Sequence, residues 1–292
     1  MRITDGMVSE ASRAALQRAR LKVFNASQVA STGVRVEKPG DDPSAAGRAR
    51  RLREEGARLE ATMQAADEGR RGLDAVDDTL AHFSDIFTEA RALAVQGGND
   101  TIGATERGLI ADQIAGLRAD LLQSTATRFD GRYILNGVGE DQPPYDAAGN
   151  FVGQRALRSV EASAGHFVAT GIAIGDVLSP VAGTDAFAEL TALETALRTN
   201  NSAGIAAGIN SMRDIGIRVA DARGDVGNRM MSFDLAYALG QRLSDRTQAD
   251  LTQTVDADVF DALTELQRSQ TALEQALSIA AKLPIPGLAQ RR

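Results

Sequence analysis

The chain has 292 residues, a net charge of −7, no cysteine and no tryptophan. The lack of cysteine excludes disulfides and thiolate metal sites. The chain has 39 acidic and 32 basic side chains. This balance argues against a general nucleic-acid binder, because such proteins present a basic surface to the phosphates. No segment approaches the ~18 consecutive apolar residues that a membrane-spanning helix needs, and the first ten residues lack the features of a Sec signal.

Residues 1–42 predict a helical arm with a thin apolar stripe. Ile3, Met7, Leu21 and Phe24 recur at helical spacing, but polar side chains interrupt the same face. Because helix nucleation is costly, an isolated helix of this kind is marginal in water and needs a partner.

A turn is predicted directly after this arm. Pro39 and the following glycine must turn the chain, and Asp42 followed by Pro43 is typical of an N-cap with proline in the first helical position. Capping also explains the paired carboxylates Asp41 and Asp42 better than acid–base chemistry or cation binding.

Residues 43–128 predict the first part of a helical rod. Apolar side chains repeat every seven residues, which holds one seam toward a partner helix: Leu52, Leu59, Ala66, Leu73, Leu80, Phe87 and Ala94. The long helix is expected from about 43 to 96, and a further amphipathic helix from about 104 to 128 returns antiparallel to it.

The character of the sequence changes over residues 129–184. Turn pairs such as Asp-Gly and Asn-Gly alternate with short apolar runs at 133–135, 151–152 and 166–168. This pattern predicts a small β-rich outer domain with short strands.

Helix is expected again over residues 185–254, the second part of the rod, where a second heptad series runs: Ile205, Met212, Val219, Val226 and Phe233.

Residues 255–292 predict a C-terminal helix that pairs with the N-terminal arm. An acidic N-cap precedes one apolar stripe that stops before two prolines: Val259, Leu263, Leu266, Leu273 and Leu277. The predicted fold is therefore mainly α: an elongated antiparallel helical rod with coiled-coil-like terminal helices and a small β-rich insertion domain. The thin stripes of both ends leave apolar area unburied in a monomer. We therefore expect the C-terminal stripe, together with Ile3, Met7, Leu21 and Phe24, to carry the contacts between subunits.

The sequence offers no enzyme-like constellation. His82 and His166 are the only histidines and have no second ligand nearby in sequence, and no phosphate-binding glycine loop or nucleophile elbow occurs. The pair Asp77 and Asp78 is expected on a solvated helix face. We expect no catalytic residue, no metal site and no cofactor.

Several segments, taken in order along nearly the whole chain, resemble the flagellin superfamily, and within it the proteins of the hook–filament junction. They are the start Met1-Arg2-Ile3-Thr4, the turn at residues 38–46, the segment 129–137, and the terminal-helix segments 256–258, 262–266 and 270–277. The sequence departs from the pattern in its proline-containing, basic C-terminal tail.

The resemblance implies a structural adaptor that assembles as a ring and connects hook to filament. It also implies export to the extracellular flagellum through the type III apparatus without a cleaved signal. The implied partners are further copies of the chain, the hook-side junction protein (hook-associated protein 1), flagellin or the filament, and an export chaperone, but no nucleic acid and no membrane span. The alternatives are a filament flagellin, which shares the terminal helices, and a cytoplasmic coiled-coil scaffold, which the heptads alone would support.

Overall fold

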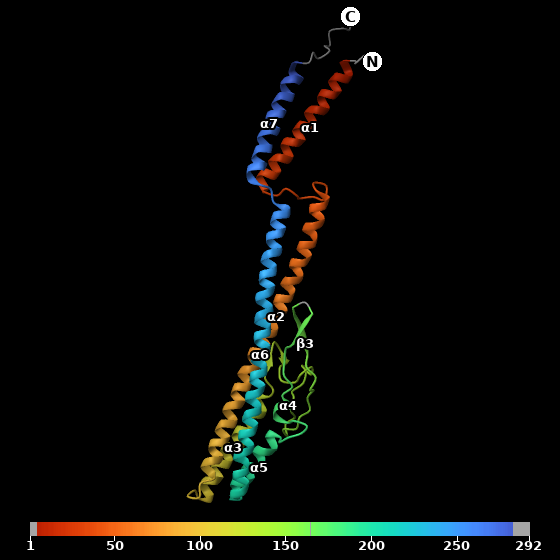
Figure 1. Cartoon of the computed structure of the whole chain (residues 1–292). Coiled ribbons are helices and arrows are strands. Elements are labelled where there is room, and N and C mark those ends of the chain that lie inside the picture. Colours follow the sequence, from red (N-terminus) through yellow and green to blue (C-terminus); the bar gives the residue numbers. More distant parts are fainter. Residues whose placement is uncertain (1–4, 164, 283–292) are drawn as a thin grey trace. The chain divides into compact units, whose positions relative to one another are not determined.

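A computed structural model describes residues 5–163 and 165–282. It divides into two compact units, one of residues 1–57 with 244–292 and one of residues 58–243. Within the described ranges the chain forms seven helices and four short strands (Figure 1), which confirms the mainly α fold. The five domain limits given above stay a prediction.

The first unit is built around two terminal helices, α1 (Asp5–Thr32) and α7 (Val259–Lys282). They pack against each other along their lengths and run antiparallel (Figure 1). Gly33 ends α1 in the left-handed region, with a φ of 70°, which glycine adopts without steric cost. Within the described residues, the two terminal helices therefore lie against each other.

Backbone hydrogen bonds join the segments that follow α1 and precede α7. Val34 forms an antiparallel bridge with Asp256. The Ala257 N–H donates to the Gly33 carbonyl over 2.8 Å, and the Arg35 N–H donates to the Val255 carbonyl over 2.8 Å. These bonds satisfy backbone groups at two helix ends, where intrahelical partners are missing.

Two long helices, α2 (Pro43–Gly97) and α6 (Ser202–Val255), contribute to both units. In the second unit their heptad series form the core, as the sequence predicts. All five members of the α6 series are at most 1% exposed, and so are the α2 members from residue 66 onward, which are Ala66, Leu73, Leu80, Phe87 and Ala94. The earlier members, Leu52 and Leu59, are only half-buried.

Two shorter helices, α3 (Ala104–Ser124) and α5 (Ala186–Arg198), complete a four-helix bundle in this unit. Side-chain contacts give the order of neighbours around it as α2, α3, α5, α6. They are His82 with Asp120 between α2 and α3, Arg198 with Asp112 between α3 and α5, Leu193 against Gly208 between α5 and α6, and Arg223 with Asp77 between α6 and α2.

Asp77 departs from its expected role on a solvated helix face. Its two carboxylate oxygens accept hydrogen bonds from Arg223 Nε and Nη2, both over 3.0 Å. This pairing raises the pKa of Arg223 above its usual value. Arg223 interrupts the apolar pattern of α6 in the sequence. In the structure its guanidinium forms a bidentate ion pair with Asp77 of α2.

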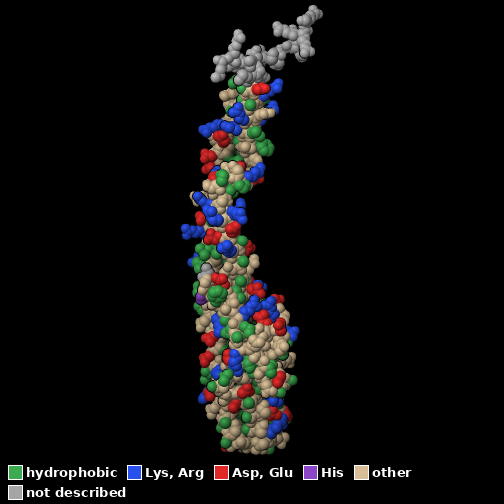
Figure 2. Space-filling model, turned by 90° about the vertical axis from the view of Figure 1, so that its right-hand side faces the viewer, with side chains coloured by type: hydrophobic (Ala, Val, Ile, Leu, Met, Phe, Trp, Pro, Cys, Tyr) green, Lys and Arg blue, Asp and Glu red, His purple; other side chains and the backbone are tan. Residues whose placement is uncertain are grey.

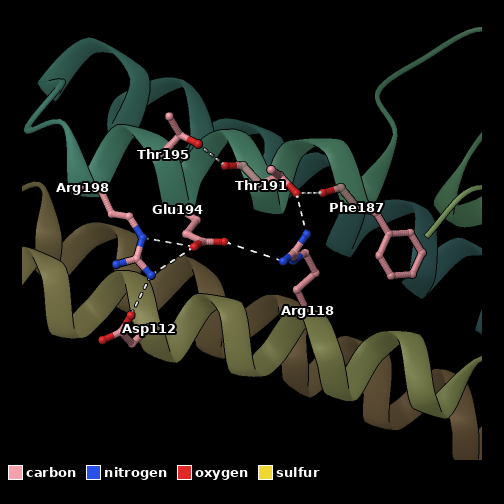
Figure 3. A network of polar contacts seen from close by, with 7 residues as sticks. All are labelled: Asp112, Arg118, Phe187, Thr191, Glu194, Thr195 and Arg198. Carbon is pink, nitrogen blue, oxygen red and sulfur yellow. Dashed lines mark hydrogen bonds and ion pairs between the residues drawn. The ribbon is translucent and has the colours of Figure 1, made fainter. Parts of the chain in front are cut away.

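A network of polar side chains ties α3 to α5 (Figure 3). Arg198 donates to Asp112 over 2.6 Å and to Glu194 over 3.1 Å, and the bond to Asp112 is the main cause that raises the pKa of Arg198. Arg118 donates to the Thr191 hydroxyl over 3.1 Å and lies 3.9 Å from Glu194. The network sets the register of the two helices at the edge of the bundle.

The segment between α3 and α5 contains two small antiparallel sheets and a one-turn helix, α4 (Gly175–Leu178). In the first sheet, β1 (Arg128–Phe129) and β2 (Arg132–Tyr133) are joined by Asp130 and Gly131, both with positive φ. Such a two-residue turn matches the twist of a hairpin. The second sheet pairs β3 (Ser159–Ser163) with β4 (His166–Ala169).

The strands predicted in this segment are only partly correct. The prediction at 166–168 corresponds to β4, but β3 was not predicted. Leu135 is buried yet lies in a loop, where its carbonyl accepts a hydrogen bond from the Ile174 N–H. Phe151 forms only an isolated bridge with Tyr145. Apolar runs between turn residues predict strands at these positions, whereas in the structure hydrogen bonds between loops satisfy the backbone groups.

Tyr145 anchors these loops. Its ring lies 5.5 Å from that of Phe151 and 4.8 Å from that of Phe187 between centroids. Its hydroxyl lies 2.9 Å from the Ser179 hydroxyl, and burial raises its pKa well above the usual range. The insertion is therefore held by an aromatic cluster rather than by an extensive sheet.

Candidate assembly surfaces

The seam between α1 and α7 is made of small and medium-sized apolar side chains. Most of them are only half-buried: Leu16, Ala19, Val23 and Ala26 on α1, and Leu266, Leu273 and Ala276 on α7. Ala262 is buried, and so is the small polar residue Ser269. Because two helices alone cannot cover each other fully, this pair leaves much of its apolar surface open.

The apolar side chains predicted as subunit contacts divide between the seam and the open surface. Leu266 and Leu273 lie in the seam. Exposed fractions of the others are 61% for Leu21, 65% for Phe24, 63% for Val259, 52% for Leu263 and 44% for Leu277. Ile3 lies outside the described residues, as does the side chain of Met7, although its backbone belongs to α1.

Four of the exposed side chains share one side of the helix pair. At about 3.6 residues per turn, Phe24 lies about a third of a turn from the seam of α1. Val259, Leu263 and Leu277 lie about a quarter of a turn from the seam of α7, in the same sense. In two antiparallel helices, residues that are offset from the seam by similar angles in the same sense lie on the same side of the helix pair. These four residues therefore form one apolar flank. Apolar side chains do reach the molecular surface among charged ones (Figure 2).

Two exposed apolar residues of α7 are not predicted as contacts from the sequence. Phe260 is 83% exposed and Ile279 is 61% exposed. Phe260 directly follows Val259 and therefore falls outside a stripe of period three to four. Its size and aromatic character were the available signal, because a large apolar side chain at a polar helix position is informative.

The turn at residues 39–43 is organised by its two carboxylates. Asp41 accepts hydrogen bonds from the backbone N–H groups of Glu37 and Lys38, over 3.1 and 2.8 Å. Asp42 accepts from the N–H groups of Ser44 and Ala45, both over 3.0 Å. Pro43 is the first residue of α2, and Pro39 is exposed. Asp42 therefore caps the helix in the way its position suggests.

Arg35 links this turn to the other end of the chain and was not singled out from the sequence. Its Nη1 lies 3.3 Å from the Asp42 carboxylate, and its Nη2 donates to the Thr254 carbonyl over 3.0 Å. The hydrogen bond from the Ala45 N–H, followed by that from the Ser44 hydroxyl, is the main cause that lowers the pKa of Asp42 from 3.8 to about 2.

We expect Asp42→Ala to speed hydrogen exchange at the Ala45 amide, because the change removes its acceptor. Asp42→Asn is the matched control, since the amide oxygen still accepts. A depressed pKa contributes stability that is complete above the unfolded-state value and is lost as pH falls through the folded-state value. Protection at Ala45 should therefore decline between pH 4 and pH 2 in the natural chain but not in Asp42→Asn. Equal profiles would contradict this account.

The described residues contain no group of three or more side chains suited to hold a metal ion. His82 is half-exposed and lies 3.1 Å from Asp120, and His166 is exposed. Among the described helices, none is long and apolar enough to cross a membrane.

Comparison with known proteins agrees with this architecture. Residues 3–140 match the family described as the bacterial flagellin N-terminal helical region. Flagellar hook-associated protein 3 of Salmonella typhimurium is 24% identical over 298 residues, which cover 94% of each chain. The Escherichia coli protein of the same name is 24% identical over 299 residues, with the same coverage.

Solved structures share the fold. A putative flagellar hook-associated protein from Vibrio parahaemolyticus has a TM-score of 0.70 at 16% identity, over 74% of this chain and all of that one. FlgL of Bacillus cereus has a TM-score of 0.61 at 17% identity, over 69% of this chain and 99% of that one. These matches confirm the resemblance predicted from the sequence: the chain is similar along nearly its whole length to flagellar hook-associated protein 3, and residues 3–140 are similar to the N-terminal helical region of bacterial flagellin.

Proposed function

We propose that this chain is a structural adaptor of the bacterial flagellum that joins hook to filament. The observation that carries the proposal is the similarity to two proteins named flagellar hook-associated protein 3 over 94% of the chain. The role is structural and not catalytic, and its place is outside the cell, in the flagellum. Export proceeds without a cleaved signal.

The exposed apolar side chains of α1 and α7 support assembly as the mode of action. Apolar burial contributes about 25 cal/mol per Å², and the flank of Phe24, Val259, Leu263 and Leu277 is open in the single chain. In the proposed ring, copies of the chain cover this flank, and the hook-side junction protein and the filament contact the two sides of the ring. The C-terminal helix, before export, is the binding site for an export chaperone.

A deletion of the gene tests the adaptor role. An adaptor predicts cells that complete their hooks but bear no filaments, with the filament subunit free in the medium. Expression of the natural chain should restore attached filaments. If the chain were the filament flagellin itself, the medium of the deletion strain would lack a filament subunit. A cytoplasmic scaffold would leave attached filaments in place.

A further inference from the structure

Two arginines of α6 contact the insertion, the segment between α3 and α5. Arg218 Nε donates to the Val177 carbonyl over 3.1 Å, and its Nη1 and Nη2 donate to the hydroxyl and the carbonyl of Thr184 over 3.0 and 2.8 Å. Arg229 Nη1 donates to the Gly171 carbonyl over 3.0 Å. Both guanidinium groups therefore reach from the long helix to the backbone of the insertion.

The charge of these two arginines is not used in ion pairs. Within residues 5–163 and 165–282, no ion pair joins Arg218 or Arg229 to a carboxylate, and both residues are half-buried. Hydrogen bonds from a charged donor are stronger than those between neutral groups, and the planar guanidinium fixes the directions of its acceptors. The two side chains are thus suited to orient the loops that they contact.

The two arginines lie on the same face of α6. They are eleven residues apart, which is close to three full turns and about 16 Å along a helix that rises 1.5 Å per residue. Their acceptors belong to different parts of the insertion, because Gly171 follows β4 whereas Val177 lies in α4. A body attached at one point can pivot there, and a second attachment on the same face prevents the pivot.

The other contacts of the insertion constrain its direction less. Leu135, Ile174 and Leu178 are fully buried in the core that the insertion shares with the helices, but apolar burial is non-directional. A cavity of about 270 Å³ lies between α2 and the two small sheets, with Gly69 and Gly72 on its α2 wall. The insertion therefore has room to move toward α2.

We propose that Arg218 and Arg229 form a two-point clamp that fixes the orientation of the insertion on the helical rod. This inference goes beyond the proposed function, since it concerns the single chain. The arginines are positioning residues, because their effect is exerted through the loops that they hold. In an assembly of copies, clamped insertions all present the same face, whereas insertions held at one point take a range of orientations.

Distances between spin labels on the purified full chain test the clamp, because the chain has no cysteine of its own. The reference label is attached to Leu235→Cys on α6, a position that is 71% exposed. The second label is attached either to Phe167→Cys in β4, 63% exposed, or to Val181→Cys in the loop after α4, 88% exposed. Each second site lies close in sequence to one clamp point. Double electron–electron resonance then measures the distribution of each distance.

Each arginine should affect the label nearer to its own contact. Arg229→Gln should widen the distribution for the β4 label at least about twofold, because that end of the insertion then opens locally while the other stays attached. The distribution for the label after α4 should keep nearly its natural width. Arg218→Gln should do the reverse.

Arg223→Gln is the matched control. It removes the same charge from the same helix, but the partner of Arg223 is Asp77 on α2, so both distributions should keep their natural widths. Lysine provides a conservative replacement. Arg229→Lys should keep the natural width, because one ammonium group still donates to one carbonyl. Arg218→Lys should widen the distribution, because an ammonium group does not reproduce the three-bond guanidinium contact.

Three outcomes would overturn the clamp. The first is natural widths in both glutamine variants, and the second is equal widening at both label sites. The third is the same widening in the Arg223→Gln control, which would show a general loss of stability instead. Circular dichroism shows whether each variant is folded. If a glutamine variant does not fold, the lysine pair decides, and a natural width in Arg218→Lys overturns the clamp. The adaptor role is tested separately in cells and does not depend on these results.

Discussion

Replacing Phe233 by alanine is expected to lower the free energy of unfolding by about 3–5 kcal/mol. The Phe233 side chain on α6 is fully buried. Its ring lies against Gly69 of α2, so closely that an added side-chain carbon there would stand 2.7 Å from the ring. Because the α2 backbone itself forms this wall, no neighbouring side chain can move in to fill the cavity.

The measurement is urea unfolding followed by circular dichroism. Leu235→Ala is the matched control, since it lies two residues further on the same helix and is 71% exposed. That change should stay within about 0.5 kcal/mol. If the Phe233 and Leu235 variants unfold at the same urea concentration, the α2–α6 core does not hold the second unit together as described.

The double substitution Phe24→Asp and Leu263→Asp is expected to abolish self-assembly while leaving the helix content unchanged. Both side chains lie exposed on the flank of the α1–α7 pair, outside its seam. Burial of a Phe or Leu side chain contributes about 1.5–3 kcal/mol, so the loss of both weakens association by at least about 100-fold. Buried unpaired carboxylates add a further penalty.

A matched control introduces the same two charges on the same helices. Asn25→Asp and Thr264→Asp change exposed neighbours that point to other sides of the pair. Sedimentation at increasing protein concentration measures assembly. Loss of assembly in the control, or normal assembly in the Phe24 and Leu263 variant, would show that this flank does not carry the subunit contact.

The helices were predictable from the sequence because periodicity reports burial directly. A helix that buries one seam against a partner shows apolar residues at a seven-residue repeat. The series through Leu73 and Leu80 on α2, and that through Met212 and Val219 on α6, are of this kind. The same physics places Asp42 before α2, since the first turn of any helix lacks acceptors for its N–H groups.

The insertion was less predictable because its residues are buried without regular backbone pairing. Leu135 and Phe151 have the apolar character of strand residues, yet loop hydrogen bonds and the cluster around Tyr145 determine their conformation. These contacts join positions far apart in the chain, and no local pattern reports them.

The terminal stripes posed a different difficulty. A heptad-like stripe on α7 marked Leu263 and Leu266 alike, but only their three-dimensional setting separates them. Leu266 faces α1 in the seam, whereas Leu263 is 52% exposed. The apolar stripe of α7 is wider than the surface that α1 can cover. Such a stripe predicts contacts, but it does not specify which of its residues contact α1 and which contact another subunit.

The most direct test of the adaptor role is immunogold electron microscopy of whole flagella with an antibody against residues 129–180, the segment that contains both small sheets. The account predicts a single narrow band where hook meets filament. Label along the filament would identify a flagellin instead, and label confined to the cell body would contradict a flagellar role altogether.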